Sequence, residues 1–381
     1  MSTAKVAFVT GGNGITGSAI IEHLAAKTDS SQFKKIITTS RSPFQVLVSD
    51  PRIEFLALDF TRSSEELAGL MKNICSEVTH AYFSSYVHKD DFVELNQANA
   101  ALFQNFLLAL VKVAPLLENV TLQTGGKHYN VHLQPVPSPA REDGPRCGEP
   151  ETNFYYSQED ALFSHQKGSK WSWNVIRPEA IIGTTPKPNG MNSALTYALY
   201  ILTCKRLGVS PDMPTNGIYW DGYDDCSFAP VIADFTIWAS TNQNCTNQAF
   251  NITNGDYFCW RYMWPRICNY FGVESSPHTQ FSKPGLEIGK PFLETSFTEW
   301  ATPEKQKVWE QICEDSGCKE AKTTWAAGTW QYQDWVFGRT WSATLSMSKA
   351  RNFGYTGYMD SFEAFVETYE KMKQLKQIPS W

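Results

Sequence analysis

Two adjacent tyrosines and one lysine are the side chains of this sequence best suited to act on a bound substrate. A phenol can donate a proton to a substrate oxygen or stabilise negative charge there, and a nearby ammonium group helps by lowering the phenol pKa. Tyr155 and Tyr156 are the candidate phenols, but the residues one helical turn later are Glu159 and Asp160. Because a carboxylate in that position is expected to raise a tyrosine pKa, the cation must come from another segment, and Lys127 is the candidate.

Lys127 lies in the segment Leu122–Tyr129 (LQTGGKHY), which follows directly from a predicted strand. The carboxyl ends of parallel strands border the ligand crevice of an α/β sheet, so Lys127 can reach the same site as Tyr155. His128 and His132 have a spacing that would suit a metal ion, but two loop histidines without a third ligand predict no metal site.

A glycine motif occupies residues Thr10–Gly17, which read T-G-x-x-G-x-x-G between a predicted strand and a predicted helix at Ser18–Lys27. Gly11 permits the tight turn, Gly14 lets the backbone approach a pyrophosphate, and Gly17 allows the helix to pack closely on the strand. A diphosphate would then lie at the helix N-terminus, where free N–H groups and the helix dipole favour an anion. The motif therefore predicts a dinucleotide-binding site.

The end of the second predicted strand indicates which dinucleotide binds. NAD enzymes place an acidic residue there to hold the ribose 2′-hydroxyl, but this strand ends without a carboxylate, at Ser40 and Arg41. A hydroxyl and a planar cation suit a 2′-phosphate, so the sequence favours NADP(H). Asp59 and Phe60, which close the third strand, are placed to meet the adenine.

The elements that must position these residues alternate regularly through the first half of the chain. Short apolar or β-branched runs are separated by helical patterns or polar loops; the runs are Lys5–Thr10, Lys34–Ser40, Ile53–Leu58, His80–Ser84, Val120–Thr124 and Trp173–Arg177. This rhythm predicts an α/β fold with a Rossmann-type doubly wound parallel sheet.

The amino-acid composition changes after about Gly183, where Pro, Asn, Gly and Trp become frequent. The run Ala249–Ile252 resembles one more strand, which we expect to return to the main sheet. The sequence therefore predicts an NADP(H)-binding domain at 1–183 with a returning strand near 248–255, and a mainly substrate-binding lobe at 184–381, interleaved with the first domain.

Composition excludes several classes of partner. The 381 residues carry a net charge of −6 with Lys and Arg spread along the chain, so we expect neither nucleic acid nor a membrane as partner. The first strand begins at about Lys5, which leaves no room for a signal peptide, and nine cysteines without a pairing pattern predict free thiols. We therefore expect a cytoplasmic protein; a homodimer is left open.

Five sequence motifs, taken together and in this order, resemble those of a known family. They are LQTGGKHY (122–129), NFYYSQED (153–160), RPEAIIG (177–183), WDGYDDCS (220–227) and AFNITNGD (249–256). They are similar to the progesterone 5β-reductase/iridoid synthase-like group of short-chain dehydrogenases/reductases, and they extend over most of the chain. The resemblance implies an enzyme of secondary metabolism that uses NADPH to reduce the C=C bond of an enone or enal, in some members with cyclisation.

The resemblance also implies roles for individual residues. Tyr155 would be the catalytic tyrosine and would also border the cofactor, and Lys127 would be its partner. The cofactor residues would be Asn13, Gly14 and Ile15 at the phosphates, Ser40 and Arg41 at the 2′-phosphate, and Gln123, Ser85 and Ile181 at the nicotinamide. Plant members usually have arginine immediately before the lysine, where this chain has Gly126, and they differ at the pocket segment 84–86. These differences bear on the native substrate more than on the cofactor.

The expected reaction delivers hydride to the β-carbon of an activated alkene in a small apolar metabolite, with Tyr155 and Lys127 stabilising the enolate oxygen. Tyr86, Trp330 and Trp335 are candidates for the substrate-binding wall, because the C-terminal part is rich in aromatic residues. Three alternatives stay open: a carbonyl reductase, an NADP-bound isomerase or cyclase without net redox chemistry, and a cofactor-sensing regulator. A regulator is disfavoured because both Tyr155 and Lys127 are present.

Overall fold

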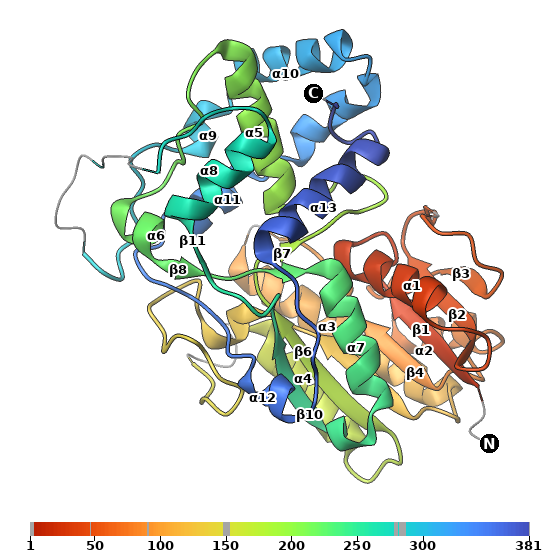
Figure 1. Ribbon diagram of the computed structural model, residues 1–381. Coiled ribbons are helices and arrows are strands. Elements are labelled where there is room, and N and C mark those ends of the chain that lie inside the picture. The colour runs from red at the N-terminus through yellow and green to blue at the C-terminus, as the bar shows by residue number, and fades with distance from the viewer. Residues whose placement is uncertain are drawn as a thin grey trace.

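A seven-stranded parallel sheet forms the centre of the protein, which the computed structural model describes at residues 4–45, 47–89, 91–147, 153–277, 281 and 287–380 (Figure 1). The strand order is β10-β6-β5-β4-β1-β2-β3, and every pairing in this sheet is parallel. The strands are β1 (Lys5–Thr10), β2 (Phe33–Ser40), β3 (Ile53–Ala57), β4 (His80–Phe83), β5 (Asn119–Gln123), β6 (Ser172–Pro178) and β10 (Gln248–Ile252). Four short strands form two separate pairs, β7 (Ile181–Ile182) with β9 (Ser227–Phe228) and β8 (Tyr223–Asp224) with β11 (Phe258–Cys259).

Helices cover both faces of the sheet because its strands are apolar on both sides. In β1, Val6 and Phe8 belong to the core beneath α2, α3 and α4, whereas Ala7 and Val9 belong to the core beneath α1 and α7. These helices are α1 (Ile15–Lys27), α2 (Ser64–Met71), α3 (Phe92–Val113), α4 (Phe154–Gln166) and α7 (Ala229–Thr241). The predicted α/β doubly wound architecture is confirmed, including the late strand, since β10 pairs with β6.

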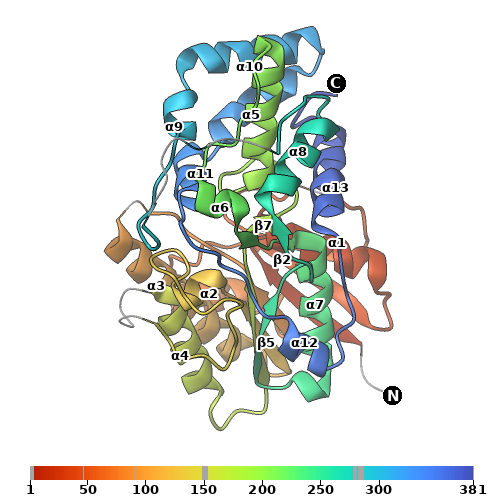
Figure 2. The same cartoon turned by 60° about the vertical axis from the view of Figure 1, so that its left-hand side comes forward.

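A helical lobe lies over one end of the sheet (Figures 1 and 2). Its helices are α5 (Ser193–Leu207), α6 (Gly217–Asp221), α8 (Trp260–Tyr270), α9 (Phe297–Trp300), α10 (Pro303–Asp315), α11 (Trp330–Phe337) and α13 (Ser361–Gln374). The described residues also include the 3₁₀ helices η1 (Gly126–Tyr129), η3 (Gln243–Cys245) and η4 (Lys319–Ala327) and the short helix α12 (Ser348–Asn352). The core of the lobe is strongly aromatic, with Tyr197 in contact with the rings of Trp260, Trp264 and Phe337.

The chain crosses between lobe and sheet more than once. After α11, residues 339–347 run back to the sheet side, where Leu345 bridges to Ala140 and the indole of Trp341 donates to the Val131 carbonyl (3.0 Å). α12 then packs against β10 before α13 re-enters the lobe. Assigning the lobe to the substrate and the sheet to a cofactor remains a prediction.

Two general expectations can be compared with the structure. All nine cysteines are free thiols, as predicted. Among the residues described, no helix has both the length and the apolar character needed to cross a membrane.

Gly17 is the glycine with the least room for a side chain, which leads to a stability prediction. A Cβ atom at this position would lie 2.2 Å from the Gly11 carbonyl oxygen, so Gly17→Ala cannot be accommodated without moving the turn. We expect a loss of about 3 kcal/mol in the free energy of unfolding, measured by urea denaturation. Gly69→Ala in α2 is the control: its Cβ meets no atom within 4 Å, and it should add about 0.5–1 kcal/mol. Equal stability of the two variants would contradict the close approach of helix and turn.

Candidate functional site

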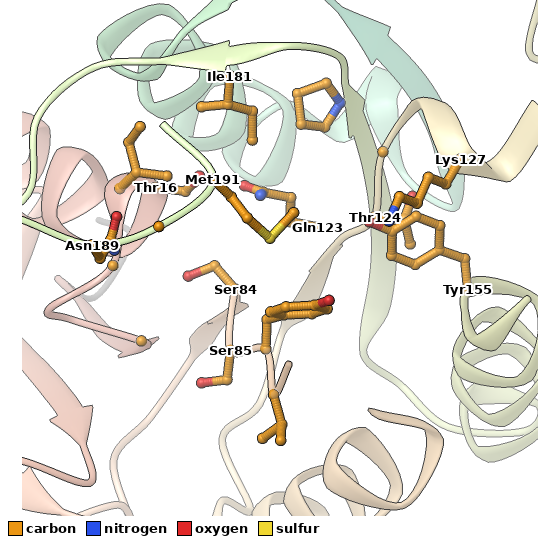
Figure 3. Close-up of a pocket in the computed structure, with 18 of the residues that line it drawn as sticks. Thr16, Ser84, Ser85, Gln123, Thr124, Lys127, Tyr155, Ile181, Asn189 and Met191 are labelled. Atoms are coloured by element: carbon orange, nitrogen blue, oxygen red, sulfur yellow. The ribbon is translucent and has the colours of Figure 1, made fainter. Parts of the chain in front are cut away.

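A cavity of about 910 Å³ opens where the carboxyl ends of the sheet strands meet the lobe (Figure 3). Of the residues singled out from the sequence, the cavity is lined by Gly11, Asn13, Gly14, Ile15, Ser40, Arg41, Asp59, Phe60, Ser85, Tyr86, Gln123, Lys127, Tyr155, Ile181 and Trp335. Gly17 and Trp330 lie outside this lining. Residues distant in sequence are thus brought to one site, large enough for a dinucleotide and a small substrate.

The glycine turn forms one end of the cavity. Gly11 has a positive φ of 67°, and its carbonyl accepts a hydrogen bond from the Gly14 N–H (2.7 Å). Gly14 is the N-cap of α1, and no side chain caps the first turn of this helix. The Thr16 hydroxyl in that turn is buried without a hydrogen-bond partner in the described structure. The helix therefore presents unpaired donors to the cavity, as an anion site requires.

Asn13 organises the loop that follows β2. Its side-chain amide donates to the hydroxyls of Ser40 and Ser42 (both 3.0 Å) and to the Pro43 carbonyl (3.1 Å). Ser40 donates to the Ser42 carbonyl. Arg41 is exposed at the rim of the cavity and has no ion-pair partner among the described residues. The loop thus holds one unengaged guanidinium where a 2′-phosphate is expected.

Buried polar atoms without partners continue along the floor. The Gln123 side-chain oxygen at the end of β5 and the hydroxyl of Thr124 after it find no hydrogen-bond partner among the residues described, although both side chains border the cavity (Figure 3). Such atoms are costly unless a ligand satisfies them. Together with the uncapped helix and the free guanidinium, they fit a nicotinamide dinucleotide lying from Arg41 toward Ile181.

Tyr155 and Lys127 lie beyond this floor, and Figure 3 shows both side chains at the same end of the cavity. Asn153 connects their segments, because it caps α4 by accepting from the Tyr155 N–H (3.2 Å) and donates to the Lys127 carbonyl (2.7 Å). A Cβ atom on Gly125 would be 3.3 Å from the Tyr155 hydroxyl, so the phenol lies against the turn that carries Lys127. The predicted pair is therefore brought together at one site.

Burial governs the protonation of this pair. It raises the pKa of Tyr155, with smaller contributions from Tyr86 and Tyr332, and it lowers the pKa of Lys127. The carboxylate one turn along α4 was expected to raise the pKa of Tyr155, but the raised value comes from burial instead. At neutral pH Tyr155 therefore carries its proton and can donate a hydrogen bond.

The Glu159 carboxylate takes part in a buried ion-pair cluster. Its carboxylate lies 2.9 Å from the Arg177 guanidinium, 3.2 Å from His128 Nδ1 and 3.4 Å from Arg146. Burial opposes ionisation, but the contacts with His128 and Arg177 outweigh it and lower the pKa of Glu159 to about 2. The Glu159 carboxylate therefore lies beneath the site, where its contact with His128 anchors the segment that carries Lys127.

Comparison with known proteins assigns the chain to a family. Residues 7–327 match the family described as PRISE-like Rossmann-fold domain. The chain belongs to the PRISE-like family. It is 54% identical over 375 residues to the short chain dehydrogenase gsfE of Penicillium aethiopicum, which covers 98% of this chain and 99% of the relative. It is 31% identical over 382 residues to an (S)-8-oxocitronellyl enol synthase of Nepeta racemosa, covering 98% and 93% of the two chains.

A solved structure, the Bordetella bronchiseptica enzyme WbmH in complex with NAD+, shares the fold with a TM-score of 0.62 at 15% identity, over 97% of this chain and 99% of that one. The resemblance of the five sequence motifs to the progesterone 5β-reductase/iridoid synthase-like group is confirmed. This PRISE-like chain is an enzyme, an oxidoreductase of the short-chain dehydrogenase/reductase type.

Tyr156, the second candidate phenol, faces away from the cavity of the PRISE-like chain. It is fully buried, donates to the His128 carbonyl (2.6 Å) and accepts from the Cys147 N–H (2.9 Å). One residue along a helix turns a side chain by about 100°, which separates the two tyrosines. His128 is likewise buried against Glu159, and His132 packs against Trp335. No group of three or more metal-ligating side chains occurs among the described residues.

Helix α11 supplies the cavity wall from the lobe. Tyr332, Trp335 and Val336 line the cavity with the i, i+3, i+4 spacing of one helix face, and Arg339, just after the end of the helix, lines it as well. Trp330, a sequence candidate for the substrate wall, lies on another face, where its ring packs against Trp325 (4.9 Å between ring centroids) and other aromatic rings of the lobe core. The wall residue from the start of this helix is thus Tyr332.

The sequence reasoning missed several lining residues. Asn189, Gly190 and Met191 reach the cavity from an irregular loop, for which no local pattern exists. Glu179 could have been predicted in the same way as Lys127, because it directly follows the carboxyl end of a strand, β6, and such ends border the ligand crevice. Arg339 follows the end of α11 and carried no such signal.

Proposed function

We propose that this PRISE-like enzyme uses NADPH to reduce the activated C=C bond of an enone or enal in a small apolar metabolite. The observation that carries the proposal is the placement of Tyr155 and Lys127 in the cavity that also holds the uncapped start of α1 and the free Arg41 guanidinium. The name of the Nepeta relative supports this reaction class, because hydride addition to the β-carbon of an enal leaves an enol.

The chain's own residues would bind the cofactor along the cavity floor. The α1 N-terminus would hold the diphosphate, Ser40 and Arg41 the 2′-phosphate, Asp59 and Phe60 the adenine, and Ser85, Gln123 and Ile181 the nicotinamide end. When bound, the reduced nicotinamide supplies a hydride. Tyr155 would then donate a hydrogen bond to the substrate oxygen, where negative charge accumulates as the β-carbon is reduced, and the Lys127 ammonium would stabilise the same oxygen.

The aromatic wall contributed by Tyr86 and Trp335 suits an apolar substrate and limits the access of water. The direct test is NADPH consumption with a panel of enones, enals and saturated ketones, followed by product analysis. Saturated carbonyl products from the enones and enals support the proposal. Alcohols alone would indicate a carbonyl reductase, and isomerised products formed without NADPH oxidation would indicate the non-redox alternative.

Arg41→Ala tests the choice of cofactor. We expect weaker NADPH binding by about 1.5–3 kcal/mol, because a charge-assisted contact to the 2′-phosphate is lost, and nearly unchanged NADH binding. Calorimetric titration of both cofactors measures the difference. Arg62→Ala, which removes the same charge from a residue outside the cavity lining, is the control. An equal loss for NADPH and NADH would contradict a 2′-phosphate contact at Arg41.

A further inference from the structure

Glu179 is a buried carboxyl group on the cavity wall that the reaction described above does not use. It directly follows β6, is 8% exposed, and lines the cavity together with Tyr155, Lys127 and Tyr332. Its Oε2 atom is buried and has no hydrogen-bond partner among the described residues. A buried polar atom in that condition at the edge of a ligand cavity calls for a functional explanation.

The charges around Glu179 do not balance. Glu179, Asp224 and Asp225 lie around the single guanidinium of Arg339, and all four side chains are at least nine-tenths buried. Arg339 is 3.6 Å from a carboxyl oxygen of Glu179 and 3.6 Å from one of Asp224. Three carboxylates beside one cation would leave two uncompensated buried charges, which is strongly unfavourable. We therefore expect two of the carboxyl groups to hold protons.

Hydrogen bonding identifies which two. Asp224 accepts from the Tyr219 hydroxyl, from the Trp260 indole (2.9 Å) and from the Asp225 N–H (3.1 Å), so both of its carboxyl oxygens have hydrogen-bond donors. Glu179 and Asp225 each keep one carboxyl oxygen without a partner among the described residues. Burial accordingly raises the pKa of Glu179 to about 8 and that of Asp225 well above its usual range. Only Glu179 of these two lines the cavity.

Gly126 makes room for this acid. A Cβ atom on Gly126 would lie 2.9 Å from Glu179 Oε2, while one on the preceding Gly125 would lie 3.3 Å from the Tyr155 hydroxyl. Two consecutive glycines therefore border the phenol on one side and the carboxyl group on the other. Because the phenol and the carboxyl group both border this glycine pair, a substrate whose oxygen contacts Tyr155 can direct its α-carbon, two bonds away, toward Glu179.

We propose that Glu179 is the acid that protonates the substrate α-carbon. This rests on the proposed function. Hydride addition at the β-carbon moves the C=C electron pair into an enolate held at its oxygen by Tyr155. The Glu179 O–H bond then breaks, its electrons stay on the carboxylate, and the proton forms the new C–H bond at the α-carbon. Solvent returns a proton to Glu179 before the next turnover, so one hydride and one proton are consumed for each C=C bond.

Deuterium labelling tests the step. For an enone that the wild type reduces in D2O, a fixed acid places deuterium on one face of the α-carbon. Glu179→Gln should lower turnover about 10²-fold and deliver deuterium to both faces, because solvent then protonates a released enol. Asp225→Asn, the matched change at the second protonated carboxyl, should keep one-face labelling. Single-face labelling at the wild-type rate in Glu179→Gln would overturn the proposal.

The pH profile should change in the same variant. The acid is needed in its protonated form, so wild-type turnover should fall as pH rises through about 8. The charged and titratable groups that face Glu179 are Arg339, Asp224, Asp225 and Tyr332. In Glu179→Gln this alkaline decline should disappear, and its persistence would count against Glu179.

Infrared spectroscopy provides a readout that needs neither activity nor cofactor. The Asp225→Asn variant should retain a protonated-carboxyl C=O band at pH 7, and the double variant Glu179→Gln/Asp225→Asn should lack this band. The wild type should also show the band, so the measurement does not depend on whether Glu179→Gln folds. Absence of the band in the wild type would overturn the proposal. A wild type that reduces no C=C bond in the panel would overturn the proposed function, and the acid role with it. An active wild type with an unaffected Glu179→Gln variant would overturn the acid role alone.

Discussion

Replacing Tyr155 by phenylalanine should lower kcat for an enone by about 10²–10³, because one donor to the developing oxyanion is removed. The Kd for NADPH should be nearly unchanged, since the phenol hydroxyl lies against Gly125, beyond the cofactor floor. Lys127→Ala should cause a similar loss. The double variant should be little worse than either single one, because residues that stabilise the same oxygen act as a unit. Single-turnover kinetics with calorimetry separate the two quantities.

Tyr156→Phe is the control for this experiment. Its hydroxyl donates to the His128 carbonyl inside the protein, so we expect a stability loss of about 1–3 kcal/mol and retained turnover. If Tyr156→Phe abolished turnover while Tyr155→Phe had no effect, the catalytic tyrosine would be misassigned by one position. If both variants and Lys127→Ala kept full activity, the oxyanion model would be wrong.

Glu159→Gln should lower the free energy of unfolding by about 3–5 kcal/mol at pH 7. The substitution leaves the Arg177 guanidinium, only 5% exposed, without its carboxylate partner at 2.9 Å. Asp160→Asn on the same helix is the control: Asp160 is exposed and pairs with Arg146, so its loss should cost at most about 1 kcal/mol. Urea denaturation distinguishes the two, and a small effect for both variants would contradict an anchoring role for Glu159.

The same carboxylate makes stability depend on pH in a defined direction. Folding lowers the pKa of Glu159 from 4.5 to about 2, so its contribution, about 3 kcal/mol, is fully present above about pH 4.5. It is lost as pH falls through about 2, below which both the folded and unfolded forms bind the proton. The stability difference between wild type and Glu159→Gln should therefore shrink across this range, and a constant difference would contradict the depressed pKa.

The sheet could be read from the sequence because its strands are buried on both faces. Such strands appear as short apolar or β-branched runs, and β1 and β10 lie within one residue of the predicted ranges at each end. Helix α1 begins at Ile15, before the predicted Ser18, because the glycine turn itself enters the helix. The individual helices of the lobe could not be predicted from the sequence, because they are aromatic on several faces and the loops between them carry no periodic pattern.

The candidate site was predictable where side chains lie at a strand end or shortly after it, as Ser40 and Lys127 do. It was not predictable where the position depends on how the lobe docks, as for Met191 and Arg339. Trp330 and Tyr332 show the limit clearly: both are aromatic and two residues apart, and only the rotation of α11 decides which one borders the cavity.

The return of β10 to the sheet has a consequence for how the protein emerges during synthesis. β10 pairs with β6 and thereby completes the edge of the sheet, yet it ends at Ile252 of 381 residues. When a nascent chain has emerged from the ribosome only up to residue 183, the edge of β6 is unpaired. Helix α7, which packs beside α1 on one face of the sheet, is also still missing. Folding of the sheet is therefore tied to translation of the lobe's first helices, and the polypeptide must keep that edge from pairing with other chains until residue 252 has been added.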